Sequence, residues 1–202
     1  MIGICDYGLG NVHSFANIYK KLNVPIKFIN KPEDLKNIQK VILPGVGSYD
    51  HALHKFRKTS YFDLLNSLVT NNSIYILGVC VGMQMMGQSS EEGKSKGLNW
   101  LPLKVKKFQS NDNFKYPTPH MGWNKINVVK KHPVFFGIDQ EDFYFLHSYY
   151  CVTDEKRTEH IISNYQNNFC SGVVNKKLIA TQFHPEKSHK FGVMLLENFS
   201  KL

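Results

Sequence analysis

The most constraining feature of this 202-residue sequence is an apolar segment that runs directly into a Gly-x-Cys-x-Gly turn. Residues Ile74–Leu77 predict a buried strand, and Gly78–Gln84 follow at once with the letters GVCVGMQ. A turn of this kind between strand and helix holds its central residue in a strained backbone conformation. The flanking positions are expected to be glycines, Gly78 and Gly82, so that neighbouring backbone can pass close to the turn. A thiol at a helix N-terminus also lies near exposed N–H groups, which favour the thiolate. We therefore predict that Cys80 is a nucleophile for acyl chemistry.

A second motif, His184-Pro185-Glu186, follows a strand predicted at Leu178–Phe183. In extended chain, residues two apart point to the same face, so His184 and Glu186 are expected side by side on one strand. Pro185 lacks an N–H and suits a strand terminus. A thiol nucleophile needs a histidine to take its proton, and a carboxylate beside the histidine fixes the orientation of the ring. Alone, His184 is an ordinary polar residue at a strand end; with Cys80 it predicts a catalytic triad.

The order of predicted elements indicates an α/β fold. The first half alternates strands and helices, expected at Ile2–Cys5, Val12–Leu22, Ile26–Ile29, Lys40–Leu43, within Tyr49–Val69, and at Ile74–Leu77. The second half predicts short strands and one closing helix, at Leu103–Phe108, Lys125–Val129, Phe143–Leu146, His160–Tyr165, Cys170–Val174, Leu178–Phe183 and Phe191–Phe199. Alternation of strand and helix favours a parallel sheet with helices on its faces. We expect one domain over residues 1–202: a mostly parallel central sheet flanked by helices, with a smaller antiparallel portion in the second half.

Composition narrows the function classes. The formal charge of +9 suggests a nucleic-acid protein, but only two of the 25 basic residues are arginines and the lysines are spread along the chain. Nucleic-acid proteins usually concentrate basic residues and use arginine forks. No secretory leader opens the sequence, and no apolar run reaches the roughly 18–20 residues of a membrane helix. We expect a cytoplasmic protein that binds neither nucleic acid nor membrane.

The sequence predicts no metal site and no cofactor. Its cysteines are widely scattered and form no C-x-x-C pair: Cys5, Cys80, Cys151 and Cys170. His51 and His54 share a helix face but lack a third ligand, which favours surface histidines. The loops Gly8–Gly10 and Gly45–Gly47 both lack the third glycine of a dinucleotide fingerprint. They are expected to be strand-to-helix turns, or to line a site at the carboxyl ends of the strands.

Together, these motifs resemble the class I (triad) glutamine amidotransferases, and most closely the glutaminase subunits of imidazole glycerol phosphate synthase. The matching segments run from end to end: Asp6–Asn11, Leu43–Ser48, Gly78–Gln84, Ser90–Gly93, Pro119–Asn124, Leu146–Tyr149 and Ala180–Ser188. The cysteine turn and the His-Pro-Glu motif are common to triad amidotransferases. The Met-Gly-Trp-Asn and His-Ser-Tyr segments point to the synthase glutaminases.

The resemblance implies a reaction and a role for each triad residue. Cys80 would attack the side-chain carboxamide of glutamine, His184 would act as general base and acid, and Glu186 would orient the histidine. Ammonia would leave, and water would hydrolyse the thioester to glutamate. The resemblance also assigns backbone donors of an oxyanion hole to Val81, Val46 and Gly47. It assigns contacts with substrate glutamine to Gln84, Gly47 and Ser148.

The resemblance implies a partner as well. Synthase glutaminases dock as heterodimers on a (β/α)8-barrel synthase subunit, which receives the ammonia without its entering bulk water. Trp123 and Lys187 match positions near the seam between the subunits. Without the resemblance, they would be a packed aromatic and a solvated lysine.

Three other functions stay open at this point. The first is a paralogous glutaminase subunit that feeds ammonia to a surface-sugar-modifying amidotransferase. The second is a cysteine peptidase or γ-glutamyl hydrolase on a related fold, which Gln84 and the full segment 184–188 disfavour. The third is a binding subunit without activity, which the intact triad disfavours.

Overall fold

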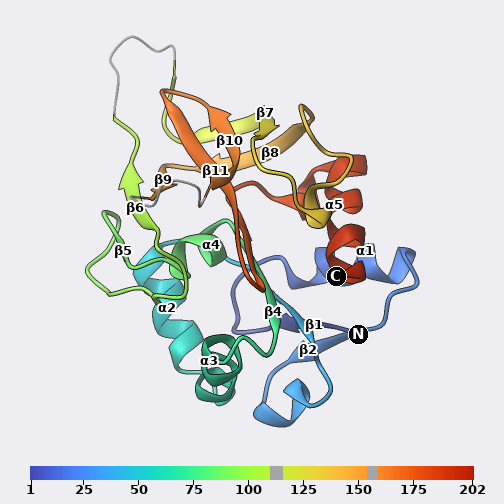
Figure 1. The fold of residues 1–202 in the computed structure, drawn as a ribbon. Helices are drawn as coiled ribbons and strands as arrows, with labels where there is room; N and C mark the ends of the chain where they lie inside the picture. Colours follow the sequence, from blue (N-terminus) through green and yellow to red (C-terminus); the bar gives the residue numbers. More distant parts are fainter. Residues whose placement is uncertain (110–115, 154–158) are drawn as a thin grey trace.

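The computed structural model describes residues 1–109, 116–153 and 159–202, whose strands form one continuous sheet (Figure 1). Its parallel half has the spatial order β2 (Ile26–Ile29), β1 (Ile2–Cys5), β3 (Lys40–Leu43), β4 (Tyr75–Val79) and β12 (Leu178–Thr181). Within this half, all neighbouring strands are parallel to each other. All four residues of β1 are buried, because a parallel sheet of this kind is covered on both faces.

Helices supply that cover. One face carries α1 (Val12–Lys21) and α5 (His189–Lys201), which pack against each other; the other carries α2 (Tyr49–Arg57), α3 (Phe62–Thr70) and α4 (Val81–Met85). Right-handed crossovers explain the division, because the chain moves in opposite directions along the sheet from β1 to β2 and from β3 to β4. Among the described residues, we find no helix with the length and apolar character needed to cross a bilayer.

The second half of the chain extends the sheet with antiparallel strands. Beyond β12 they follow in the order β11 (Asn168–Asn175), β10 (Glu159–Asn164), β7 (His120–Val128) and β8 (Asp142–His147). A branch leaves β11 through β9 (Tyr149–Val152), β6 (Lys104–Lys107) and the two-residue β5 (Ser89–Ser90). The predicted α/β fold, mostly parallel with an antiparallel portion in the second half, is confirmed.

Several boundaries differ from the prediction. The helical stretch expected within Tyr49–Val69 is two helices, α2 and α3. Strand β7 begins at His120 instead of Lys125, and β12 ends at Thr181 instead of Phe183. Strands β5 and β9 were not predicted. Short 3-10 helices occur at Pro32–Leu35, Pro133–Phe135 and Pro185–Lys187.

The parallel strands all end at the same edge of the sheet, and this edge collects the motifs. The loop Pro44–Gly47 follows β3, Cys80 follows β4, and His184 lies three residues beyond the end of β12. Because β4 and β12 are direct neighbours, with Val79 opposite Thr181, residues 102 positions apart in sequence meet here. Ligands of α/β sheets bind outside the carboxyl ends of such strands.

Candidate active site

Cys80 forms the predicted elbow between β4 and α4. Its φ of 55° is one that residues other than glycine rarely adopt, so the elbow is strained. A Cβ on Gly82 would overlap the carbonyl oxygen of Leu43, and one on Gly78 would overlap the side chain of Met86. Gly82 therefore needs glycine, as expected, because its neighbour is backbone, whereas a larger residue at Gly78 would require the Met86 side chain to move. The side chain of Cys80 is almost fully buried at the N-terminus of α4.

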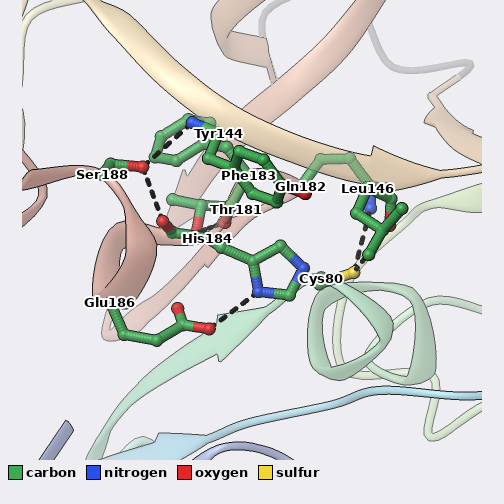
Figure 2. A network of polar contacts seen from close by, with 9 residues as sticks. All are labelled: Cys80, Tyr144, Leu146, Thr181, Gln182, Phe183, His184, Glu186 and Ser188. Atoms are coloured by element: carbon green, nitrogen blue, oxygen red, sulfur yellow. Dashed lines mark hydrogen bonds and ion pairs between the residues drawn. The ribbon is translucent and has the colours of Figure 1, made fainter. Parts of the chain in front are cut away.

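His184 and Glu186 are paired beside this cysteine. Nδ1 of His184 lies 2.8 Å from Oε1 of Glu186, and both side chains are buried. Nδ1–H donates a hydrogen bond to the carboxylate, and the other ring nitrogen, Nε2, faces Cys80 (Figure 2). Oε2 of Glu186 is buried without a hydrogen-bond partner among the described residues.

The local structure that makes this pair differs from the prediction. The prediction that His184 and Glu186 lie on one extended strand is wrong, because Pro185–Lys187 form one turn of 3-10 helix. Proline fixes φ near −65°, which suits the first position of such a turn better than a continued strand. The turn folds Glu186 back onto the ring of His184.

The charges of the site favour a protonated His184. Burial disfavours the imidazolium, but the interactions with Cys80 and Glu186 outweigh it and raise the pKa of His184 to about 10. The main chain holds the residue in place: its N–H donates to the carbonyl of Tyr144 (2.9 Å), and its carbonyl accepts from Oγ of Ser188 (2.6 Å). Ser188 Oγ in turn accepts from the N–H of Tyr144 (3.0 Å), which joins β8 to the histidine (Figure 2).

A cavity of about 260 Å³ opens over these residues. Its size lies just below the roughly 300–1,000 Å³ typical of sites for drug-sized ligands, which suits a ligand of amino-acid size. It is lined by Val46, Gly47, Cys80, Val81, Gln84, Glu92, Pro119, Leu146, His147, Ser148, Tyr149, His184 and Lys187. All residues expected to contact the substrate or its oxyanion are in this set.

The expected oxyanion residues lie next to the nucleophile. Val81 follows Cys80, and Val46 and Gly47 line the same cavity from the loop after β3. The hydroxyl of Tyr7 donates to the carbonyl of Pro44 (2.5 Å) and so anchors the start of that loop. Backbone N–H groups arranged around a reacting carbonyl are the usual donors to an oxyanion.

Two glutamine side chains connect the elbow to β9 and β12. Nε2 of Gln84 donates to the carbonyl of Tyr149 and to Oε1 of Gln182, both at 3.1 Å. Nε2 of Gln182 lies 3.7 Å from Sγ of Cys80, and Sγ lies 3.9 Å from the carbonyl of Leu146 (Figure 2). Sequence reasoning missed Gln182, whose side chain the structure shows to be fully buried two residues before His184.

Sequence reasoning also gave no role to Glu92, which lines the cavity. Its Oε2 accepts from the N–H of Tyr49 at the start of α2 (3.0 Å). Burial raises the pKa of Glu92, and the nearby charge of Asp50 adds to the rise, while the hydrogen bond from Tyr49 opposes it. The signal was its place in the segment Ser90–Gly93, which carried part of the resemblance.

The residues expected at a partner interface lie on an exposed surface beside the cavity. Trp123 is 50% exposed, and its ring stacks on that of His189 with centroids 5.0 Å apart. Met121 and Leu146 are exposed neighbours across β7 and β8. Lys187 lines the cavity, and its Nζ lies 5.6 Å from the ring centroid of Tyr144. We call Met121, Trp123, Tyr144 and Leu146 the β7–β8 face.

Other motifs of the sequence lie apart from the cavity. His51 and His54 are exposed on α2, and within the described ranges no three His, Cys, Asp or Glu side chains are grouped to hold a metal ion. Cys5, Cys151 and Cys170 are buried. Their interpretation as small buried hydrophobes is confirmed.

Comparison with known proteins agrees with this geometry. The family model "Glutamine amidotransferase class-I" matches residues 3–201. "Imidazole glycerol phosphate synthase subunit HisH" of Leptospira borgpetersenii is 43% identical, and its counterpart in Bdellovibrio bacteriovorus 41%, over the full length of both chains in each case. The structure of PurLQS from Thermotoga maritima is similar in fold, with a TM-score of 0.73, 16% identity and coverage of 98% of this chain and 96% of that one. The chain belongs to the class-I glutamine amidotransferase family, in the group of HisH subunits.

Proposed function

We propose that this chain hydrolyses glutamine to glutamate and ammonia with the triad Cys80, His184 and Glu186. The observation that carries the proposal is the strained, buried cysteine facing a histidine whose other nitrogen is bound to a buried carboxylate. It is supported by family membership and by the full-length likeness to HisH subunits.

The geometry supports a two-step mechanism. The thiolate of Cys80 attacks the carboxamide carbon of glutamine, and the N–H of Val81 and the backbone of the Gly45–Gly47 loop bind the developing oxyanion. His184 gives its proton to the leaving nitrogen, and ammonia departs. His184 then takes a proton from water, which attacks the thioester and releases glutamate. The sum is glutamine plus water to glutamate plus ammonia.

We propose that four residues of the cavity bind the substrate glutamine. The carboxylate of Glu92 suits the α-ammonium group of an amino acid, because its second oxygen is not used by Tyr49. Gly47 and Ser148 line the same space. Both N–H groups of Gln84 are engaged with Tyr149 and Gln182, so Gln84 would accept a hydrogen bond from the substrate through its Oε1.

We further propose that residues 1–202 act as one amidotransferase domain and dock on a (β/α)8-barrel synthase subunit as a heterodimer. The ammonia would then complete imidazole glycerol phosphate for histidine biosynthesis. The name of the HisH relatives, a subunit of that synthase, supports a partner chain. Trp123 and Lys187, exposed beside the cavity, are proposed to lie at the contact.

The test is glutamate release from glutamine by the purified chain, alone and with the synthase subunit of the same organism and its ribulosyl nucleotide ligand. Strong stimulation that Cys80→Ala abolishes is the expected result. Glutamine hydrolysis that this synthase subunit does not stimulate would instead favour a sugar-modifying amidotransferase as the partner. Hydrolysis of γ-glutamyl peptides in preference to glutamine, or activity retained by Cys80→Ala, would contradict the proposed function.

A further inference from the structure

Beneath the β7–β8 face lies a chain of hydrogen bonds that the proposed mechanism does not use. His120 and His147 face each other across β7 and β8, and both rings are buried. Nδ1 of His120 lies 2.9 Å from Nε2 of His147. The ring of His120 is stacked between Phe145 and Tyr165, with centroid distances of 4.8 and 4.0 Å.

The direction of every bond in this chain follows from its ends. Nδ1 of His147 lies 2.8 Å from the carbonyl of Tyr149, which can only accept, so this nitrogen carries the proton. Burial lowers the pKa of His147 to about 3 and that of His120 to about 4, so both rings are neutral. Nε2 of His147 is then an acceptor, and Nδ1 of His120 donates to it.

The same reasoning extends to Asn124. Nε2 of His120 is left as an acceptor, and the amide nitrogen of Asn124 donates to it at 3.2 Å. This amide is itself fixed, because it also donates to the carbonyl of Asn164 (2.8 Å) and its oxygen accepts from the N–H of Lys125 (2.8 Å). The chain therefore runs in one direction, from Asn124 through His120 and His147 to Tyr149.

The end of the chain lies in the wall of the cavity. The carbonyl of Tyr149 accepts from Gln84 as well as from His147. The bond from His147 spans Ser148, where the chain passes from β8 into β9. Residues Leu146–Tyr149, which we call the corner, all line the cavity, and the carbonyl oxygen of Leu146 lies 3.9 Å from Sγ of Cys80. The hydrogen bond from the His147 ring therefore fixes the turn between His147 and Tyr149, and the same Tyr149 carbonyl joins the corner to Gln84.

We propose that His120 is a positioning residue of the glutamine pocket, which acts through His147 to fix the corner, while Asn124 orients the ring of His120. The proposal rests on the glutamine hydrolysis proposed above. Loss of the donor on His120 leaves a buried acceptor on His147 unpaired, and the ring can then turn away from Tyr149. The pocket would lose its shape for glutamine, while the triad stays intact.

The first test separates binding from chemistry in the full chain with its synthase subunit. His120→Phe keeps the stacked ring but removes both nitrogens, and we expect it to raise KM for glutamine by about tenfold with kcat within about twofold of the parent. His120→Asn restores a donor near the position of Nδ1 and should recover most of the loss. Tyr165→Phe, which removes a hydroxyl bound to the carbonyl of Pro117 but keeps the stack, is the matched control and should change neither constant.

A second readout does not depend on turnover. Iodoacetamide should alkylate Cys80 at the parent rate in His120→Phe, whereas about tenfold more glutamine should be needed for half-maximal protection. The third readout needs no variant: ¹⁵N NMR of the imidazoles should find the proton on Nδ1 and not on Nε2 in both His120 and His147. A proton on Nε2 of either ring would contradict the proposal even if the variants fail to fold.

Three results would overturn the proposal: an unchanged KM and protection by glutamine in His120→Phe, a loss confined to kcat, or an Nε2-protonated ring at either histidine. None of these results bears on the proposed function, which is tested separately by the glutaminase activity of Cys80→Ala. If Cys80→Ala stays active, the proposed function fails whatever His120 does.

Discussion

Gly82 lies with its Cα against the carbonyl oxygen of Leu43, so closely that a single added carbon would overlap it. The contact joins the first turn of α4 to the end of β3 and fixes Cys80 beside the Gly45–Gly47 loop. We predict that Gly82→Ala lowers the free energy of unfolding by about 1–3 kcal/mol, the usual cost of overpacking. Because the elbow must shift, glutamine hydrolysis and Cys80 alkylation should both slow. Denaturant unfolding and iodoacetamide kinetics check this; a variant with parent-like values for both would show that the contact is unimportant.

Replacing the orienting acid should affect both chemistry and stability. Glu186→Gln removes the charge that helps to hold the raised pKa of His184, and we expect kcat to fall by at least about 100-fold. Stabilisation by a raised histidine pKa is fully present below about 6.5 and is lost as pH rises through about 10. Between pH 7 and 10, the parent should therefore lose more stability than Glu186→Gln. Glu197→Gln, which removes an exposed partner of Lys201, is the control and should match the parent in both respects.

The neutral histidine pair predicts acid sensitivity. The pKa values of His120 and His147, about 4 and about 3, lie below the unfolded value near 6.5, so the unfolded chain binds protons first as pH falls. Their contribution to stability is full above pH 6.5 and declines towards pH 3–4, with a slope of at most about 1.4 kcal/mol per pH unit for each ring. Urea unfolding at pH 7, 6 and 5 measures the slope. His120→Phe should reduce it, whereas His54→Asn, on the exposed side of α2, should leave it unchanged.

Glu92 should control affinity for the amino-acid end of the substrate. Glu92→Gln keeps an acceptor for the N–H of Tyr49 and removes only the charge, so the fold should be preserved. We expect KM for glutamine to rise by about tenfold or more with a smaller change in kcat, because charged hydrogen bonds contribute about 1.5–3 kcal/mol. Steady-state kinetics test it, with Glu91→Gln as the control; Glu91 is bound to Lys106 and Lys107 outside the cavity. Equal KM values in parent and Glu92→Gln would remove Glu92 from the binding site.

Trp123 should be an anchor of the partner complex. Trp123→Ala removes an exposed ring that does not line the cavity, so glutamine hydrolysis by the chain alone should be unchanged. Affinity for the synthase subunit should fall by at least tenfold, or about 1.4 kcal/mol. Titration calorimetry gives the number. The control is Phe136→Ser, because Phe136 is 80% exposed but lies beside Lys201 and Leu202 at the end of α5. An equal loss in both variants would show that Trp123 has no special role.

The parallel half of the fold was predictable because its signals are local. Ile2–Cys5, Ile26–Ile29 and Lys40–Leu43 are short apolar runs between helical or turn segments, and the structure has strands at those positions. Strand β9 was missed because Tyr149–Val152 follows β8 after a single residue, with no glycine or proline between them. The corner at Ser148 is made by a hydrogen bond from the ring of His147, which leaves no mark in local composition.

The residue types of the candidate site were easier to predict from the sequence than its backbone geometry. Cys80, His184 and Glu186 were selected by residue type, and the structure brings all three to one edge of the sheet. The extended form expected at Glu186 failed because Pro185 favours a turn as readily as a strand end. Gln182 and His120 could not be found from sequence alone, since their partners come from elements that are distant in sequence.

The position of β12 has a consequence for the protein during its own synthesis. This strand is inserted between β4 and β11, so the middle of the sheet stays unfilled until residues near 181 have left the ribosome. Cys80 is made about one hundred residues before the histidine and the carboxylate that would activate it. A nascent chain therefore carries the thiol without its base, and the triad stays incomplete until residues 178–186 have folded into place.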